Sequence, residues 1–142
     1  MKTLLQIGIL FLSINSFAQC VKCKSLEEAD KKPEMVKSIQ INSYFGGELA
    51  EIPASIKNFI NLEELFLTDL DLKSVPKEIG DLTNLKSLSL AGNSLEELPS
   101  ELFQLKKLEE LILYSNNFTE GYIEKLRSEM KIKLPKTKLM VD

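Results

Sequence analysis

Apolar residues recur along this chain at a fixed spacing of 23 residues. Three segments share the order Leu-x-x-Leu-x-Leu, and they begin at Leu62, Leu85 and Leu108. Most of the positions between these leucines are polar or charged. A less regular copy begins at Val36 and carries about three extra residues around Gly46-Gly47. A fixed period in this range predicts a solenoid, in which each repeat is one structural unit stacked on the next.

Each repeat is expected to contain one short strand and one outer segment. The alternation of Leu65 and Leu67 puts two side chains on one face of a strand, because side chains in a strand alternate between its faces. Pro76 and Pro99 cannot donate a ladder hydrogen bond, so they belong on the outer side of the repeat. The apolar residues after each proline recur at a spacing of three, which favours a helical or 3₁₀ turn. Stacked strands then pair in parallel, and the outer segments close the core.

The repeat motif is similar to that of a known family. The order L-x-x-L-x-L-x-x-N-x-L-x-x-L-P-x-x-I/L-x-x-L, over about residues 36–118, resembles leucine-rich repeats. It is most similar to the 23-residue class of bacterial proteins and of plant intracellular Ras-group-related proteins. The resemblance implies an α/β fold, namely a short solenoid of about four repeats with a parallel concave sheet, and usually a binding role. The asparagine of the motif is present as Asn93 and Asn116, but Leu70 takes its place in the second copy.

Both flanks of the repeats are predicted to form helical caps. Upstream, Ser25-Leu-Glu-Glu28 has the pattern of a capping box, and the short helix that it opens should end near Lys32, before Pro33. Downstream, Thr119 is a suitable N-cap, so residues 119–142 form a C-terminal cap with a helix. The segment Leu139–Val141 is expected to add a closing strand.

The N-terminus has the pattern of a secretory signal peptide over residues 1–18. The apolar run Leu4–Ile14 is shorter than the ~20 residues of a membrane span. Small residues at Ser16 and Ala18 predict cleavage after Ala18. The mature protein is therefore predicted to be secreted or periplasmic, with no membrane span. An uncleaved membrane anchor is the alternative.

Two cysteines follow the predicted cleavage site, in the segment 19–35 that precedes the repeats. In an oxidising compartment, Cys20 and Cys23 are expected to form a disulfide that fixes the new N-terminus. A thiol-redox role for this CxxC pair is the alternative, since Cys23 would lie near a helix start. A lipid anchor at Cys20 is a minor alternative, because Gln19 precedes that cysteine in place of a small residue.

The concave face of the sheet is the predicted binding site. Phe66 and Ile112 occupy the same repeat position two strands apart, which separates them by roughly 10 Å. Only small side chains stand between them, so a shallow notch with apolar walls and a rim of carboxylates is expected. The predicted ligand-binding residues are Glu64, Phe66, Thr68, Asp69, Ser89, Ala91, Glu110, Ile112 and Tyr114.

Composition argues against several functional classes. The chain has 142 residues, 44% of them hydrophobic and 27% charged, with a net charge of −3. Such a balance does not indicate a nucleic-acid partner. The chain lacks histidine, the commonest general base and metal ligand, so we predict no metal, no cofactor and no enzymatic activity. A basic cluster, Lys131, Lys133, Lys136 and Lys138, is interpreted as a solvated face of the C-terminal cap; contact with an anionic surface is the alternative.

Together these patterns predict an extracytoplasmic module that binds a protein or peptide on its concave strand face. Two alternatives share much of the same sequence pattern. One is a structural repeat protein of the envelope or cell surface, and the other is a CxxC thiol-redox protein.

Overall fold

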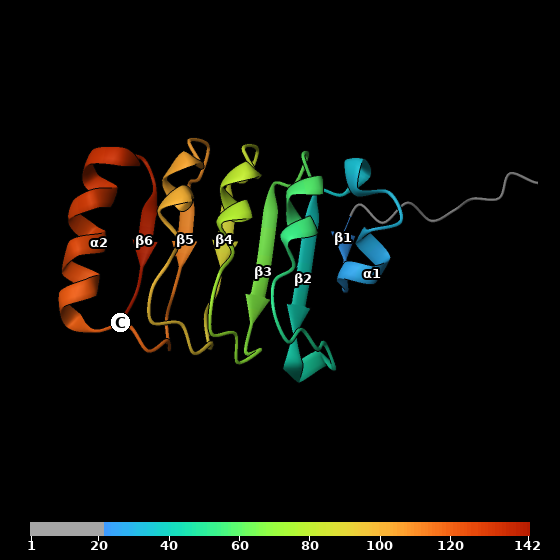
Figure 1. Ribbon diagram of the computed structural model, residues 1–142, viewed down its shortest axis with the longest axis horizontal. Helices are drawn as coiled ribbons and strands as arrows, with labels where there is room; N and C mark the ends of the chain where they lie inside the picture. The colour runs from blue at the N-terminus through green and yellow to red at the C-terminus, as the bar shows by residue number, and fades with distance from the viewer. Residues whose placement is uncertain (1–21) are drawn as a thin grey trace, which may run out of the picture.

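A single parallel sheet runs the length of the molecule (Figure 1). The computed structural model describes residues 22–142, so the predicted signal peptide and Cys20 lie outside the described residues. Within this range six strands pair in the order of the chain. They are β1 (Lys22–Cys23), β2 (Ser38–Asn42), β3 (Glu64–Thr68), β4 (Ser87–Ser89), β5 (Glu110–Ile112) and β6 (Lys138–Met140).

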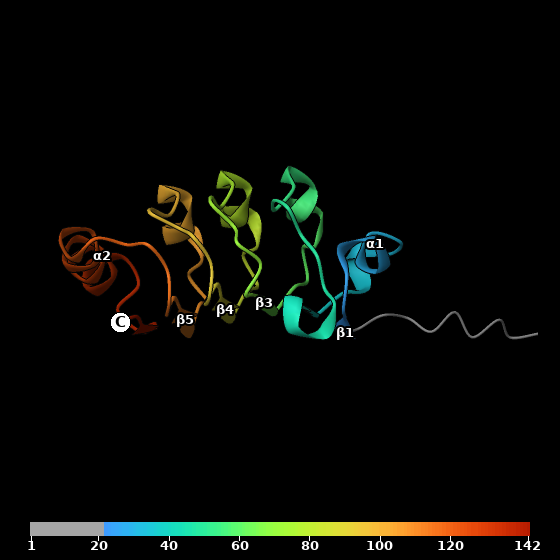
Figure 2. The ribbon, with the colours of Figure 1, turned by 90° about the horizontal axis from the view of Figure 1, so that it is seen from below.

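A second layer of helices and turns covers one face of the sheet (Figure 2). Two α-helices lie near its ends, α1 (Leu26–Ala29) and α2 (Glu120–Lys133). Short 3₁₀ turns lie between them along the chain, and three of these turns begin directly after Pro53, Pro76 and Pro99. The 3₁₀ turns are Pro33–Met35, Ser43–Phe45, Ala54–Asn58, Lys77–Asp81 and Ser100–Gln104. The predicted α/β solenoid with a parallel sheet is confirmed.

The register of the sheet follows the sequence period. Glu64 pairs with Ser87, and Ser87 pairs with Glu110, so each step advances the chain by 23 residues. Ser38 pairs instead with Glu64, 26 residues further on. The difference of three matches the extra residues of the first copy, and these residues form the 3₁₀ turn Ser43–Phe45 and the glycines after it. The insertion therefore projects from one repeat without shifting the others.

The repeated leucines form the core between the two layers. Leu65, Leu88 and Leu111 are fully buried at equivalent strand positions, and so are Leu67 and Leu90. Each buried leucine contributes about 1.5–3 kcal/mol relative to an exposed one. No single repeat could bury these side chains, so the stack is held together chiefly by contacts between neighbouring repeats.

Asn93 satisfies backbone groups at the bend after β4. It is only 6% exposed, and its Nδ2 atom donates to the carbonyl oxygens of Leu67 at 2.8 Å and Leu90 at 2.9 Å. Its Oδ1 atom accepts from the N–H groups of Leu70 at 3.2 Å and Leu72 at 3.0 Å. One side chain thus links two consecutive repeats where the strand hydrogen bonds have ended.

Asn116 has the same role one repeat later. Its Nδ2 atom donates to Leu90 and Leu113, both at 2.9 Å, and its Oδ1 atom accepts from the N–H group of Leu95. Leu70, at the equivalent place in the second copy, has no polar side chain to do this. The asparagine ladder therefore stabilises the C-terminal half of the solenoid and is absent from the N-terminal half.

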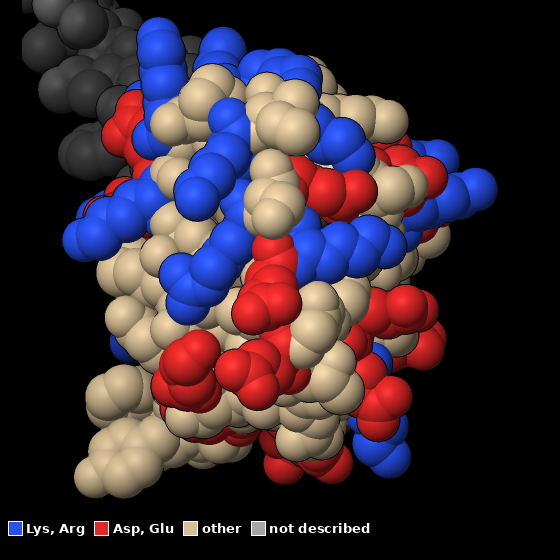
Figure 3. Space-filling view, turned by 90° about the vertical axis from the view of Figure 1, so that its left-hand side faces the viewer, with Lys and Arg blue, Asp and Glu red and all other residues tan. Residues whose placement is uncertain are grey.

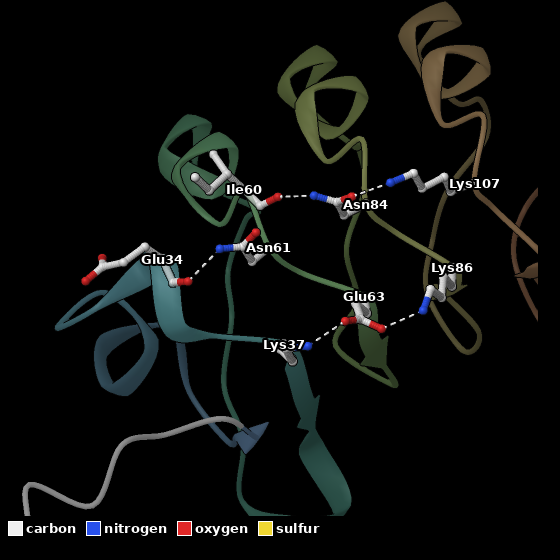
Figure 4. Close-up of polar contacts among 8 residues, drawn as sticks. All are labelled: Glu34, Lys37, Ile60, Asn61, Glu63, Asn84, Lys86 and Lys107. Carbon is white, nitrogen blue, oxygen red and sulfur yellow. Dashed lines mark hydrogen bonds and ion pairs between the residues drawn. The ribbon is translucent and has the colours of Figure 1, made fainter.

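A second polar ladder lies where the strands begin (Figure 4). Glu63 lies between two lysines, with Lys37 Nζ at 2.9 Å and Lys86 Nζ at 2.7 Å from its carboxylate oxygens. The Lys86 and Lys37 ammonium groups lower the pKa of Glu63 to about 2, and Glu63 in turn raises the pKa of Lys86. Asn61 and Asn84, 23 residues apart, each donate to a backbone carbonyl of the preceding unit at 2.8 Å. These contacts fix the spacing between repeats.

The predicted caps are found in part. Helix α2 begins after Thr119, whose Oγ1 accepts from the N–H of Tyr122, and β6 closes the sheet as the Leu139 pattern predicted. Helix α1 has only four residues and ends at Ala29, so the prediction of a helix that reaches near Lys32 was wrong. Lys32 adopts φ −152° and ψ 71°, because the residue before a proline avoids helical geometry.

Candidate functional site: the concave face of the sheet

The register places the side chains of the concave face in rows that cross the strands. One row pairs polar and charged residues, and its members are Ser38, Glu64, Ser87, Glu110 and Lys138. The next row is mostly apolar or small, and its members are Gln40, Phe66, Ser89, Ile112 and Met140. The buried residues Leu65, Leu88 and Leu111 alternate with these positions, so both rows lie on the face opposite the core.

The apolar row has the residue order of the predicted notch and continues it by one strand. Phe66 and Ile112 are half-buried and flank Ser89, which is only 4% exposed. Ser89 thus forms the floor of the notch rather than a contact that reaches out to a ligand. Met140 of β6 is also half-buried and lies beside Ile112. The apolar wall therefore spans β3 to β6, at about 4.8 Å per strand.

Two carboxylates border the notch on the side where the strands begin. Glu64 and Glu110 are half-exposed, and neither forms an ion pair with another residue of the range 22–142. They occupy equivalent positions two strands apart, with Ser87 between them. The arrangement offers two acceptors to a cationic group that approaches the concave face.

Thr68 and Asp69, the predicted residues where strand β3 ends, already have contacts within the protein. Thr68 Oγ1 accepts from Asn42 Nδ2 at 2.6 Å, and the same nitrogen lies 3.2 Å from Asp69 Oδ2. Asp69 has φ 56°, and its carboxylate packs against Gly92, where an added Cβ would lie 2.0 Å from Oδ1. Asp69 is therefore part of the turn after β3 as well as of the rim.

The remaining predicted residues lie beyond the ends of β4 and β5. Ala91 is half-exposed and Tyr114 is 42% exposed. Gly92 donates its backbone N–H to the carbonyl of Tyr114 at 2.9 Å, so the two segments stay paired past the strands. The register thus brings six predicted residues to one face, and Asp69, Ala91 and Tyr114 lie in the segments that follow the strands.

Sequence reasoning missed several residues at the site. Met140 was assigned only to a closing strand and Lys138 only to the basic cluster, although the alternation around Leu139 already put them on the concave face. Tyr44 and Phe45 are each 86% exposed and project from the turn after β2. The insertion in the first repeat could have indicated Tyr44 and Phe45, because residues outside the repeat period have no expected position in the core.

Of the two cysteines in the predicted disulfide, only Cys23 lies within the described residues. Cys23 is 1% exposed and packs in the core, on strand β1. Because Cys20 lies outside the described residues, the Cys20–Cys23 disulfide stays a prediction. Within residues 22–142, no group of three or more acidic, cysteine or histidine side chains could hold a metal ion.

The C-terminal end of the solenoid has a marked separation of charge (Figure 3). The four lysines of the basic cluster are exposed. Lys133 Nζ lies 3.4 Å from the carboxylate of Glu129 and 4.2 Å from the ring centre of Phe103, while Lys106 donates to the carbonyl of Lys133. Cations at a helix C-terminus are stabilising, so these contacts support the interpretation as a solvated cap face.

Comparison with known proteins agrees with the repeat architecture. The family model described as leucine rich repeat matches residues 56–119. A solved leucine-rich repeat protein of Leptospira interrogans is similar at 33% identity and a TM-score of 0.68, over 79% of this chain and 26% of that one. An internalin of Listeria monocytogenes shares the fold at 18% identity and a TM-score of 0.60, over 85% of this chain and 34% of that one. No match was found among curated protein sequences.

A stack of parallel strands and proline-led turns with an asparagine ladder defines a leucine-rich repeat solenoid, and this chain belongs to the leucine-rich repeat family. It spans about a quarter and about a third of the lengths of the two solved relatives. Proteins with this fold are typically non-enzymatic modules that bind other proteins or peptides on an extended concave surface. Among residues 22–142, none of the helices has the length and apolar character to cross a membrane.

Proposed function

We propose that the protein is an extracytoplasmic binding module that holds a peptide, or an extended segment of a partner protein, on its concave strand face. One observation carries this proposal: the apolar row Phe66, Ile112 and Met140 lies beside Glu64 and Glu110, two carboxylates without an ion pair among the described residues. Apolar side chains that are gathered on one face, with polar groups at the border, are typical of interaction surfaces.

The partner should combine an apolar side chain with a basic one. The apolar side chain would rest over Ser89, between Phe66 and Ile112. A lysine or arginine of the partner would then meet Glu64 and Glu110, which lie one row away on the same strands. Charge-assisted hydrogen bonds of this type give orientation as well as affinity.

The size of the face favours a small ligand. Six strands at about 4.8 Å per step give a width of roughly 24 Å, and the longest strands, of five residues, have a length of about 16 Å. This area is well below the ~800 Å² per partner of a standard protein interface. A peptide-sized segment therefore fits better than a broad protein surface.

The compartment is part of the proposal because it rests on the sequence. Residues 1–18 have the pattern of a cleaved signal, and the resulting protein would be secreted or periplasmic. The lipid anchor at Cys20 is retained as the minor alternative. Intact mass of the mature protein separates these cases, because a diacylglyceryl adduct would appear only on a lipoprotein.

A capture experiment tests the binding role. Mature wild-type protein and the variant Phe66→Ser/Ile112→Ser/Tyr114→Ser would be used to capture partners from the native envelope and medium. Ile132→Ser is the matched control, since Ile132 is 81% exposed on helix α2, away from the concave face. Circular dichroism would check that all three proteins are folded.

The proposal predicts a partner that wild type and Ile132→Ser retain and that the triple variant loses. Equal capture by all three proteins would place the binding surface elsewhere. If none of them captured a partner, the alternative of a structural surface protein would be favoured. A thiol-redox role would have to use Cys20 as the accessible thiol, because Cys23 is 1% exposed.

A further inference from the structure

The turn inserted after β2 displays two aromatic side chains to solvent. Tyr44 and Phe45 are each 86% exposed, and their rings meet edge to face with centroids 5.3 Å apart. Large apolar side chains exposed as a pair are unusual on a monomer and mark interaction surfaces. The pair occurs only in the repeat that carries the extra residues, so the regular solenoid does not require it.

Hydrogen bonds and glycines fix the backbone of the turn that carries these rings. Asn42 Oδ1 accepts from the N–H of Tyr44 at 2.7 Å, and its Nδ2 atom donates to Thr68 on the next strand. Gly46 ends the turn with φ 78°, a conformation that favours glycine. Gly47 returns the chain so closely that an added Cβ would lie 2.8 Å from the Ile41 side chain.

A hollow lies between this turn and strand β3. Phe45 and Phe66 are among its lining residues, together with Ile41 and Gly47, and its volume is about 720 Å³. Pockets of this size hold small ligands or individual peptide residues. Because the rings of Phe45 and Phe66 contribute apolar surface to the lining, the hollow suits a large apolar side chain.

The polar residues that line the hollow are Lys24, Gln40, Asn42 and Thr68, and Asn42 and Thr68 already hydrogen-bond to each other. Lys24 is the one charged residue in the lining, is exposed, and forms no ion pair within residues 22–142. Gln40 is also exposed, and its amide has no hydrogen bond in that range. Extending the β1–β2 register past Cys23 and Ile39 puts Lys24 beside Gln40, which pairs with Phe66. A cation and an amide next to an apolar hollow are complementary to a carboxylate.

We infer that the hollow binds a large apolar side chain of a peptide whose neighbouring carboxylate pairs with Lys24. The inference rests on the proposed concave-face function and deepens it, because it fixes the direction of the ligand. The acidic end of the ligand lies over β1 and β2, and its basic residue lies over Glu64 and Glu110. The carboxylate comes either from the chain terminus or from an aspartate or glutamate side chain.

The test uses a random heptapeptide library in two formats, one with free carboxyl termini and one with amidated termini. Selection on the wild-type protein should enrich peptides with a large apolar residue next to a carboxylate. Enrichment in the free-acid format alone identifies the terminal carboxylate, whereas enrichment in both formats with an acidic residue identifies the side chain. Absence of any enriched peptide of this kind would overturn the inference.

Affinities of the enriched peptides for variants then assign the contacts. Lys24→Gln should weaken binding at least about tenfold, as expected for the loss of a charge-assisted hydrogen bond. Phe45→Ser should weaken it similarly, and Ile132→Ser should leave it unchanged. Replacing the peptide carboxylate by an amide should reduce the effect of Lys24→Gln to less than about twofold, because the pair is already absent.

These outcomes separate the inference from the proposed function. If Phe66→Ser/Ile112→Ser/Tyr114→Ser abolishes binding but Lys24→Gln and Phe45→Ser do not, the concave face binds and the inference is wrong. If Phe45→Ser abolishes binding but Ile112→Ser/Tyr114→Ser does not, the hollow binds by itself and the central notch is not the site. Circular dichroism on each variant excludes unfolding as the cause.

Discussion

The two halves of the solenoid use their side chains differently. In the C-terminal half, the side chains of Asn93 and Asn116 form hydrogen bonds with the backbone of neighbouring repeats. The loops of that half have the lengths that the 23-residue period requires. The N-terminal half has no such ladder at Leu70, and it carries the insertion with Tyr44 and Phe45. The comparison teaches that the regular repeats combine the asparagine ladder with the concave notch, whereas the irregular repeat adds exposed aromatic groups available for recognition.

Removing the ladder asparagine should give the largest loss of stability. Asn93→Ala leaves buried N–H and carbonyl groups in two repeats without partners, so we expect a loss of about 2–4 kcal/mol. Urea denaturation monitored by circular dichroism would measure it. Asn117→Ala is the control, because that side chain is exposed. Equal losses in the two variants would show that the ladder does not hold the C-terminal half together.

Two glycines in left-handed conformation should respond unequally to alanine. Gly92 has φ 67° and packs against Asp69, whereas Gly46 has φ 78° with nothing within 4 Å of an added Cβ. We expect Gly92→Ala to cost about 2–3 kcal/mol and Gly46→Ala about 1–2 kcal/mol, because only Gly92→Ala adds a steric clash to the backbone strain. The same denaturation assay compares them. A larger loss of stability for Gly46→Ala than for Gly92→Ala would contradict the close contact between Gly92 and Asp69.

The Glu63 ladder predicts a modest dependence of stability on pH. The folded-state pKa of about 2 lies below the ordinary value of 4.5, so the ion pairs stabilise the fold fully above pH ~4.5. That contribution should be lost as the pH falls from about 4.5 towards 2, because the unfolded state takes up the proton first. High salt should reduce the effect, since these groups are solvent-exposed.

Thermal denaturation of wild type and Glu63→Gln across this pH range would measure the effect. The difference between the two proteins should shrink as the pH falls. Glu109→Gln is the matched control, because Glu109 occupies the equivalent repeat position without an ion pair among the described residues. A difference between wild type and Glu63→Gln that does not change with pH would count against the ladder.

Changes in the aromatic turn should have the smallest effect on stability. Tyr44→Ser and Phe45→Ser remove side chains that are already 86% exposed, so we expect changes within about 0.5 kcal/mol. Calorimetry would establish this for each variant. A loss of more than about 1 kcal/mol would show that the turn supports the fold, and the division of roles between the two halves would then fail.

The repeat pattern predicted most of the fold because equivalent positions in successive repeats make the same contacts in the core. Leucines at a constant spacing, such as Leu65 and Leu88, must share one environment, and both are fully buried. Strand β1 could not be predicted this way, because Lys22–Cys23 has only two residues and pairs through contact with β2. The capping residues predicted the start of α1 but not its end, which lies at Ala29, before the Lys32 expected from Pro33.

The candidate site was predictable where alternation decides orientation. Phe66 and Ile112 were placed on the concave face for that reason. The burial of Ser89 was not predictable, since it depends on the bulk of its neighbours on both sides. The contribution of Phe45 was also missed, because an insertion has no repeat position from which its direction can be inferred.

Hydrogen–deuterium exchange with and without the captured partner tests the central claim most directly. We predict slower exchange on binding in residues 38–47, 64–69 and 110–114, which form the aromatic turn and the concave rows. The 3₁₀ turns of the convex layer and helix α2 should exchange at unchanged rates. Protection confined to helix α2, residues 120–133, with the concave strands unaffected, would contradict the account and assign binding to the C-terminal cap.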